Sequence, residues 1–217
     1  MNKKVWIFGD SYANREDDEN TWPAKLEDTY EVVNFARSGT GVDWSLQQMI
    51  DANKGADTKD ITAIFFLTGQ DRHNWNFWKD PEEQWMSVYL ASGSKIQKKA
   101  AAAVSEYKQY FSFARSVYKY QDANFNSRSI IKSIGAINLY ASNFEKILIW
   151  PCFDNVSLNC KLNNNVTIAS PCMNEFESPI INRPLNIDLL YAPNHLTEEK
   201  HKEILQILIK WIDTNEF

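Results

Sequence analysis

Short, continuous apolar runs recur along the chain and alternate with segments whose apolar residues follow a helical period. The runs cover residues 5–8, 30–35 and 61–67, and a fourth follows at 146–150. Uninterrupted runs of this length are typical of parallel strands that are covered on both faces. Between the first three runs, two segments have helical periodicity and are predicted to form helices, over 21–29 and 42–53. This order predicts βαβ units and a parallel sheet, so the fold class is α/β.

The middle of the chain has a different pattern. The Trp-rich stretch 73–95 is predicted to be irregular, whereas 96–121 and 125–144 are predicted to be helical. We expect residues 73–125 to form a helical insertion, or a lid, on a single domain that spans 1–217.

The end of the chain is predicted to be a loop-rich stretch followed by one helix. Residues 152–187 are rich in Asn and Pro and are predicted to be mostly loop. The last helix is predicted to begin after Thr197, where Glu198 and Glu199 favour its positive end. Its expected buried face consists of Ile204, Leu205, Ile207, Leu208, Trp211 and Ile212.

Small or polar residues follow each of the first three apolar runs. Ser11 comes after the first, Gly39 after the second and Asp71 after the third. Right-handed crossovers place the carboxyl ends of parallel strands on one edge of the sheet, where open α/β folds bind their ligands. We therefore expect these three residues to converge. Taken alone, Gly9-Asp10-Ser11 also fits a simple turn before a helix.

Composition narrows the classes of partner. The chain has 217 residues and a formal net charge of −5, and no run of Lys and Arg forms a basic stripe, which argues against nucleic acid. No apolar stretch reaches about 18 residues, so no membrane span is expected. Asn2-Lys3-Lys4 is followed by too short an apolar run for a signal peptide, and we expect a cytoplasmic protein.

The cysteines and histidines give no metal or cofactor motif. Cys152, Cys160 and Cys172 lack CxxC spacing, and we interpret them as thiols, with one disulfide as the alternative. The histidines have no ligand spacing with carboxylates. No P-loop motif is present, and Gly39-Thr40-Gly41 lacks a third glycine at dinucleotide-binding spacing, so a nucleotide-binding α/β protein is a minor alternative. We expect neither a metal nor a cofactor.

The chain has only three histidines that could act as a general base. His73 follows the third predicted strand, and His201 is expected on the exposed side of the first turns of the last helix. His195 lies just ahead of that helix, where it can point over the carboxyl edge of the sheet. Ser11 and His195 then form a nucleophile–base pair of the kind that acyl transfer needs. A lone loop histidine would also fit a surface or capping role.

Four segments along the chain occur in a characteristic order. Gly9-Asp10-Ser11 resembles the first block of the SGNH hydrolase family, the GDSL-like esterases and lipases, which carries the nucleophile. Asn34-Phe35-Ala36-Arg37-Ser38-Gly39 resembles the second block, whose glycine, here Gly39, donates a backbone N–H to the oxyanion. Gly69-Gln70-Asp71 and Pro193-Asn194-His195 fall where the third and last blocks are expected. The resemblance covers nearly the whole chain and implies a three-layer α/β/α sandwich with a mostly parallel, flavodoxin-like sheet.

The third block departs from the family's pattern. The family has an Asn there whose side-chain N–H donates to the oxyanion, and this chain has Asp71. An ionised carboxylate cannot donate and would repel the developing negative charge. Three alternatives are open: a protonated Asp71, an ion pair between Asp71 and Arg72, or an inward side chain from Gln70, Arg72 or Asn74.

The last block departs as well. The family's Asp would fall three residues before His195, where this chain has Ala192. A backbone carbonyl could orient the imidazole instead and give a Ser-His dyad, or Asp188 could complete a triad. Asn194, next to His195, and Asp10, expected to hold the nucleophile turn through backbone hydrogen bonds, are the other supporting residues.

Two functions follow from the resemblance and its departures. The first is a serine esterase or deacetylase that hydrolyses a small acyl ester, with O-acetylated carbohydrates among the candidates. Its catalytic pair would be Ser11 and His195, and its oxyanion would lie at Ser11, Gly39 and the Asp71 position. The alternative is a catalytically degenerate relative that serves as a binding or structural module. Aromatic side chains in the Trp-rich stretch would suit stacking on a sugar, and core packing explains them equally well.

Overall fold

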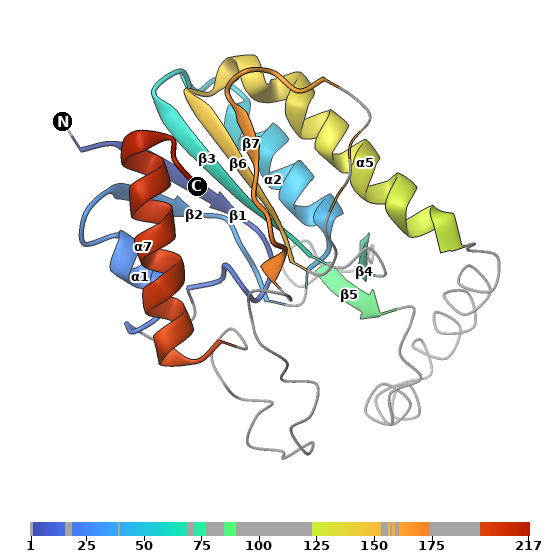
Figure 1. Cartoon of the computed structure of the whole chain (residues 1–217). Coiled ribbons are helices and arrows are strands. Elements are labelled where there is room, and N and C mark those ends of the chain that lie inside the picture. The colour runs from blue at the N-terminus through green and yellow to red at the C-terminus, as the bar shows by residue number, and fades with distance from the viewer. Residues whose placement is uncertain are drawn as a thin grey trace.

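The computed structural model contains one five-stranded sheet with helices on both faces (Figure 1). The structure describes residues 2–15, 19–38, 40–68, 72–76, 85–89, 123–152, 156, 158, 161–173 and 196–217. Of 72–76, 85–89 and 123–129 only the backbone is described.

The sheet has the strand order β2-β1-β3-β6-β7, and every neighbouring pair is parallel. The strands are β1 (Lys4–Phe8), β2 (Glu31–Asn34), β3 (Ile61–Leu67), β6 (Lys146–Pro151) and β7 (Val166–Ile168). β3 and β6 are buried at every position because they lie inside the sheet and are covered on both faces. Phe8 pairs with Phe65, so the carboxyl ends of β1 and β3 lie side by side.

Helices cover the two faces in pairs. α1 (Trp22–Leu26) and α7 (Glu198–Thr214) lie on one face, and α2 (Val42–Asn53) and α5 (Ala123–Tyr140) lie on the other (Figure 1). A short 3-10 turn, η1 (Ala141–Asn143), follows α5. Side chains alternate along β1, so Ile7 packs in the core on the α1/α7 side and Phe8 in the core on the α2/α5 side. The predicted three-layer α/β/α architecture is confirmed. Within the described helices, none is both long and apolar enough to cross a membrane.

Most predicted elements are confirmed. The helix over 42–53 and the strand over 61–67 have the predicted bounds. The last helix begins after Thr197, whose hydroxyl accepts a hydrogen bond from the Lys200 N–H as an N-cap. The helix predicted over 21–29 is shorter, because α1 ends at Leu26 and turns continue to Thr29. The helix predicted over 96–121 lies outside the described residues.

Two predictions about strands are wrong. The run 30–35 is predicted to be buried, but β2 is the edge strand of the sheet, and Val33 is 41% exposed. The stretch 73–95 is predicted to be irregular, but β4 (Arg72–Asn76) and β5 (Trp85–Tyr89) form an antiparallel pair. Residues 152–187 are predicted to be mostly loop, and their described part agrees with this: its one strand, β7, has only three residues.

Lys146, at the start of β6, holds the C-terminal end of α7. Its ammonium donates to the carbonyls of Trp211 (3.1 Å) and Ile212 (2.7 Å) and to Oδ1 of Asn215 (2.6 Å). The last carbonyls of a helix lack intrahelical partners and carry partial negative charge, so a cation there stabilises the helix. Burial lowers the pKa of Lys146, and the nearby charge of Lys3 lowers it further.

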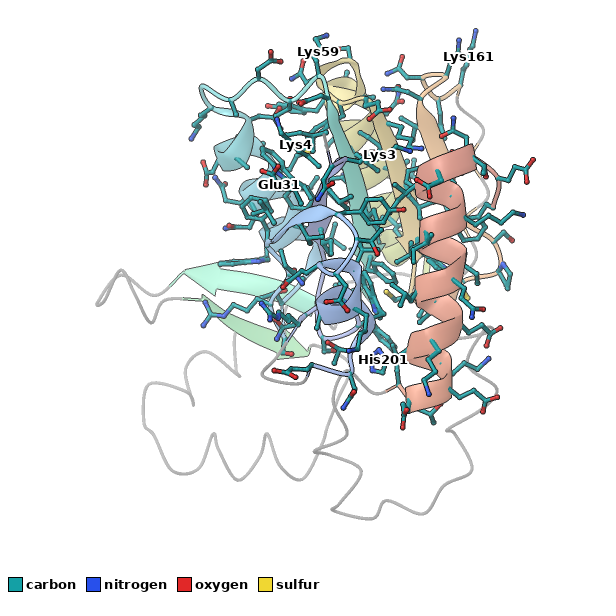
Figure 2. The ribbon with its side chains drawn as sticks, turned by 90° about the vertical axis from the view of Figure 1, so that its left-hand side faces the viewer. Lys3, Lys4, Glu31, Lys59, Lys161 and His201 are labelled. Carbon is teal, nitrogen blue, oxygen red and sulfur yellow. The ribbon has the colours of Figure 1, made fainter. Side chains whose placement is uncertain are left out.

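A second lysine, Lys3, directly precedes β1 and also binds the C-terminal end of α7. Lys3 Nζ donates to the Ile212 carbonyl and to Asp213 Oδ1, both at 3.0 Å. Figure 2 shows Lys3 and His201 toward opposite ends of α7. The hydrogen bond from Lys3 lowers the pKa of Asp213. Burial raises the pKa of Tyr30 from 10.0 to about 12, and the negative charge of Asp213 contributes.

We expect Gly9→Ala to lower the free energy of unfolding by about 1–3 kcal/mol, as overpacking does. A Cβ on Gly9 would lie 2.9 Å from Ala13 Cβ, 3.0 Å from Phe66 Cβ and 3.1 Å from the Phe66 carbonyl oxygen. Urea unfolding followed by Trp fluorescence measures the change. The matched control is Gly135→Ala in α5, where an added Cβ meets nothing within 4 Å. Higher helix propensity should stabilise that variant by about 0.5–1 kcal/mol. Unchanged stability of Gly9→Ala would contradict the close packing.

The Tyr30 hydroxyl should make stability fall at alkaline pH. Its pKa is raised on folding, so its contribution is complete below pH 10.0, the unfolded value, and is lost as pH rises through about 12. In that window the unfolded tyrosine ionises first and draws the equilibrium toward the unfolded state. We therefore expect the stability of the wild type relative to Tyr30→Phe to decrease between pH 9 and pH 11. Urea unfolding of both proteins at both pH values measures this. If the stabilities of the wild type and Tyr30→Phe changed equally with pH, the raised pKa of Tyr30 would be ruled out.

Candidate active site

The turn that follows β1 is organised by Asp10. Its backbone carbonyl accepts hydrogen bonds from the N–H groups of Ala13 (3.1 Å) and Asn14 (2.9 Å), and its Oδ1 accepts one from the Tyr12 N–H (3.0 Å). Aspartate commonly closes turns in this way, by accepting from the backbone two residues on. The side chain is fully buried, so the bond from the Tyr12 N–H also supplies a donor to a carboxylate that is costly to bury without partners. The predicted structural role of Asp10 fits this geometry.

Ser11 lies inside this turn, at the carboxyl edge of the sheet. The residue is only 6% exposed, and its Oγ is buried with no hydrogen-bond partner among the described residues. A buried hydroxyl without a partner costs roughly 1–3 kcal/mol, so most buried hydroxyls are paired. Asp10 accepts hydrogen bonds from the backbone N–H groups of Tyr12, Ala13 and Asn14. The backbone N–H of Ser11 is not one of these donors. The turn therefore holds Ser11 through its neighbours, and none of the described hydrogen bonds of the turn uses its hydroxyl.

The segment after β2 is fastened to the end of β1. The Gly9 carbonyl accepts hydrogen bonds from the Arg37 N–H (3.1 Å) and from Thr40 Oγ1 (3.3 Å). Asn14, in the Ser11 turn, donates through Nδ2 to Ser38 Oγ (3.1 Å). Ser38 and Thr40, the residues on either side of position 39, are thus each bonded to the β1 end or to the turn that follows it.

The predicted site residues divide into described and undescribed positions. Ser11 and Asp10 are described and lie together at the end of β1. Arg72 is the first residue of β4 and is described by its backbone only. The remaining predicted site residues lie outside the described part of the chain: Gly39, Asp71, Asp188, Asn194 and His195.

The described residue next to His195 belongs to the same hydrophobic core as a residue of the Ser11 turn. Leu196 is buried and belongs to the same core cluster as Tyr12, the neighbour of Ser11. Trp22, the first residue of α1, donates through Nε1 to the Tyr12 carbonyl (2.9 Å), and its backbone N–H donates to Nδ1 of His201 on α7 (3.1 Å). The start of α7 is therefore linked to the Ser11 turn through Trp22.

The prediction that His201 is exposed is wrong. The side chain is 5% exposed, and its Nδ1 accepts the N–H at the start of α1, which has no intrahelical acceptor. His201 lies three residues before Ile204 and so continues the buried stripe of Ile204, Leu208 and Trp211. That spacing is visible in the sequence and would have identified the buried position.

Sequence reasoning missed a second buried hydroxyl at this edge. Thr68 directly follows β3, the strand beside β1, and is 3% exposed. Its Oγ1 has no hydrogen-bond partner within the described residues. No feature of the sequence distinguishes this threonine, because only the fold shows that its hydroxyl is buried.

The described residues do not group into a metal site. No cluster of three or more His, Cys, Asp or Glu side chains occurs among them. Cys152 and Cys172 are both buried thiols, as predicted, and Cys160 lies outside the described residues.

Comparison with known proteins finds likenesses among solved structures. No family model matches the chain, and no curated protein matches it in sequence. Among solved structures, the chain is similar to a member of the lipolytic protein G-D-S-L family from Veillonella parvula DSM 2008. The two are 10% identical, the match covers 97% of each chain, and the TM-score is 0.47. This likeness is too distant to carry an argument about the site, which rests on the residues of this chain.

We expect His201→Ala to destabilise the protein by about 1–3 kcal/mol, because the Trp22 N–H would lose its acceptor in a buried place. His201→Asn should recover part of the loss, since Asn Oδ1 can accept near the position of Nδ1. Thermal and urea unfolding of both variants measure this. If His201→Ala and the wild type were equally stable, the cap would contribute nothing.

Proposed function

We propose that this chain is a serine hydrolase that cleaves a small acyl ester, with Ser11 as the nucleophile and His195 as the general base. The observation that carries the proposal is the Ser11 hydroxyl, which is buried at the carboxyl edge of the sheet and lacks a hydrogen-bond partner among the described residues. The ordered motifs Gly9-Asp10-Ser11 and 34–39, and the placement of His195 just before α7, support the same chemistry. Leu196, next to His195, packs in the same core cluster as Tyr12, next to Ser11.

The proposed reaction has two steps. His195 takes the proton of Ser11 as Oγ attacks the ester carbonyl, and the tetrahedral intermediate expels the alcohol, which receives that proton. Water then attacks the acyl-enzyme with His195 again as the base, and the carboxylic acid leaves. The backbone N–H groups of Ser11 and Gly39 are the proposed donors to the oxyanion.

Asp71 limits the strength of this oxyanion site. As a carboxylate it cannot donate a hydrogen bond, so the proposed site relies on two backbone donors. The loss of one donor costs about 2.7–4 kcal/mol of transition-state stabilisation in a serine protease. We therefore expect a slow esterase. Ala192 removes the usual orienting carboxylate of His195, which leaves a backbone carbonyl for a dyad or Asp188 for a triad.

O-acetylated carbohydrates are the substrates that we would test next after simple esters. Trp75 and Trp78 belong to the Trp-rich stretch that follows the third strand in sequence, and their aromatic rings would suit stacking on a sugar ring. The second candidate function is a catalytically degenerate binding module, which Asp71 and Ala192 specifically favour.

The test is Ser11-dependent chemistry. We expect purified wild-type protein to be labelled by a fluorophosphonate probe and to hydrolyse p-nitrophenyl acetate. Ser11→Ala should abolish the labelling, and His195→Ala should lower both labelling and hydrolysis by at least about 100-fold, since general-base catalysis contributes about 10²–10⁴-fold. Ser45→Ala, which removes a buried serine from α2, is the matched control and should label like the wild type.

Two results would argue against an esterase. Labelling that persists in Ser11→Ala would assign the nucleophile elsewhere. Absence of labelling and hydrolysis in the wild type would instead favour the binding module, and binding of acetylated and unacetylated oligosaccharides would be measured next.

A further inference from the structure

Asn34, the last residue of β2, joins two segments that lie beside Ser11. Its Nδ2 donates to the Ala13 carbonyl (2.9 Å), and its Oδ1 accepts from the Ala36 N–H (2.8 Å). Ala13 belongs to the turn that contains Ser11, whereas Ala36 belongs to the segment that leads to Gly39. One carboxamide therefore bonds to both segments at once.

The position of Asn34 in the sheet explains this reach. Asn34 pairs with Ile7 of the neighbouring strand, so it lies level with the last part of β1, just before the chain turns at Gly9 and Asp10. The Phe35 N–H donates to the Ile7 carbonyl (2.8 Å), and further bonds from the segment after β2 attach to Gly9 and to Asn14. Asn34 attaches to Ala13, on the far side of Ser11 from Gly9.

An amide side chain of this length suits both tasks. A carboxamide has a donor and an acceptor on one planar group, whereas an ionised carboxylate only accepts and an alkyl side chain does neither. The two bonds, both shorter than 3 Å, lie within the usual range for strong N–H···O geometry.

We propose that Asn34 is a positioning residue for ester hydrolysis, an inference that rests on the proposed function. With Asp71 unable to donate, the oxyanion depends on two backbone N–H groups that belong to different segments, one at Ser11 and one at Gly39. Two donors stabilise one oxygen only if their separation is fixed before the reaction. Asn34 fixes that separation through Ala13 and Ala36. Its removal therefore weakens the transition state and leaves substrate binding nearly unchanged.

The test compares Asn34, the last residue of β2, with a matched asparagine, Asn53, the last residue of α2. Asn53 Nδ2 donates to the Met49 carbonyl (2.8 Å), and its Oδ1 accepts from Thr58 Oγ1 (3.2 Å), so it also makes one donated and one accepted bond. Asn53 is the last residue of α2, whereas the site adjoins the loop before the first residue of α2. Asn53 is therefore farther from Ser11 than Asn34 is. Asn34→Ala and Asn53→Ala each remove two hydrogen bonds, and only the first affects the proposed site.

We expect Asn34→Ala to lower kcat for p-nitrophenyl acetate by about 10- to 100-fold, as misplacement by about 1 Å can, with KM changed by less than about twofold. Asn34→Asp keeps the acceptor for Ala36 but loses the donor to Ala13, so it should also lower kcat and serves as the second variant if Asn34→Ala does not fold. Asn53→Ala should keep the wild-type kcat while it loses a similar amount of stability. Assays are run well below the melting temperature of each variant.

The outcomes separate the two proposals. If the wild type shows Ser11-dependent turnover and the Asn34 variants keep its kcat, the positioning role is wrong and the esterase stands. If Asn53→Ala loses as much kcat as Asn34→Ala, the effect is general destabilisation and the role is again wrong. If the wild type has no Ser11-dependent turnover, both proposals are overturned.

Discussion

The close backbone approach at Gly9 is the constraint on which the carboxyl edge of this sheet depends. The α-carbon of Gly9 faces Phe66 on β3 and Ala13 in the following turn, and the distances leave no room for a side chain. Because the chain can pass so close to β3, it folds back at once, and Asp10 can close the turn over its own backbone. The Gly9 carbonyl then holds the segment after β2. One small residue thus brings the ends of three strands together.

Buried polar groups at this edge are of two kinds. Asp10 has acceptors filled by backbone N–H groups, and His201 caps α1, so both contribute to the fold. Ser11 and Thr68 are buried just as deeply, yet their hydroxyls have no hydrogen-bond partner within the described residues. Folding favours the first kind and is opposed by the second. A hydroxyl kept at such a cost, in a turn held firmly on both sides, is consistent with a role in chemistry.

The sequence predicted the central elements well because their physical signals are strong. β3 is a continuous apolar run in the middle of the sheet, and α2 has a regular helical period, so both bounds were predicted correctly. The edge position of β2 depends on which strands lie beside it, and an apolar run carries no information about that. β7 has only three residues, β4 (RHNWN) is mostly polar, and β5 (WMSVY) is mostly apolar over only five residues, so none of the three gives a clear period.

The sequence could identify candidate site residues only where they belong to a recognisable motif. Ser11 and Asp10 could be found because three consecutive residues follow a strand, and the turn bonds agree with the predicted role of Asp10. Asn34 could not be recognised as a link, because its partners Ala13 and Ala36 bond through their backbones and give no side-chain signal.

In the esterase that we propose, an ionised Asp71 and the absence of a carboxylate at Ala192 would leave more of the catalysis to backbone groups. A side-chain donor such as asparagine can adjust its torsions to reach an oxyanion, whereas a backbone N–H can move only with its whole segment. A site that relies on backbone donors therefore needs rigid segments more than it needs particular reactive groups. The hydrogen bonds that converge on Gly9, Ala13 and Ser38 provide that rigidity in the described part of the chain. If the protein is an esterase, these hydrogen bonds between segments are what position its oxyanion donors. The same rigid segments would also preserve a binding surface in a relative that had lost catalysis.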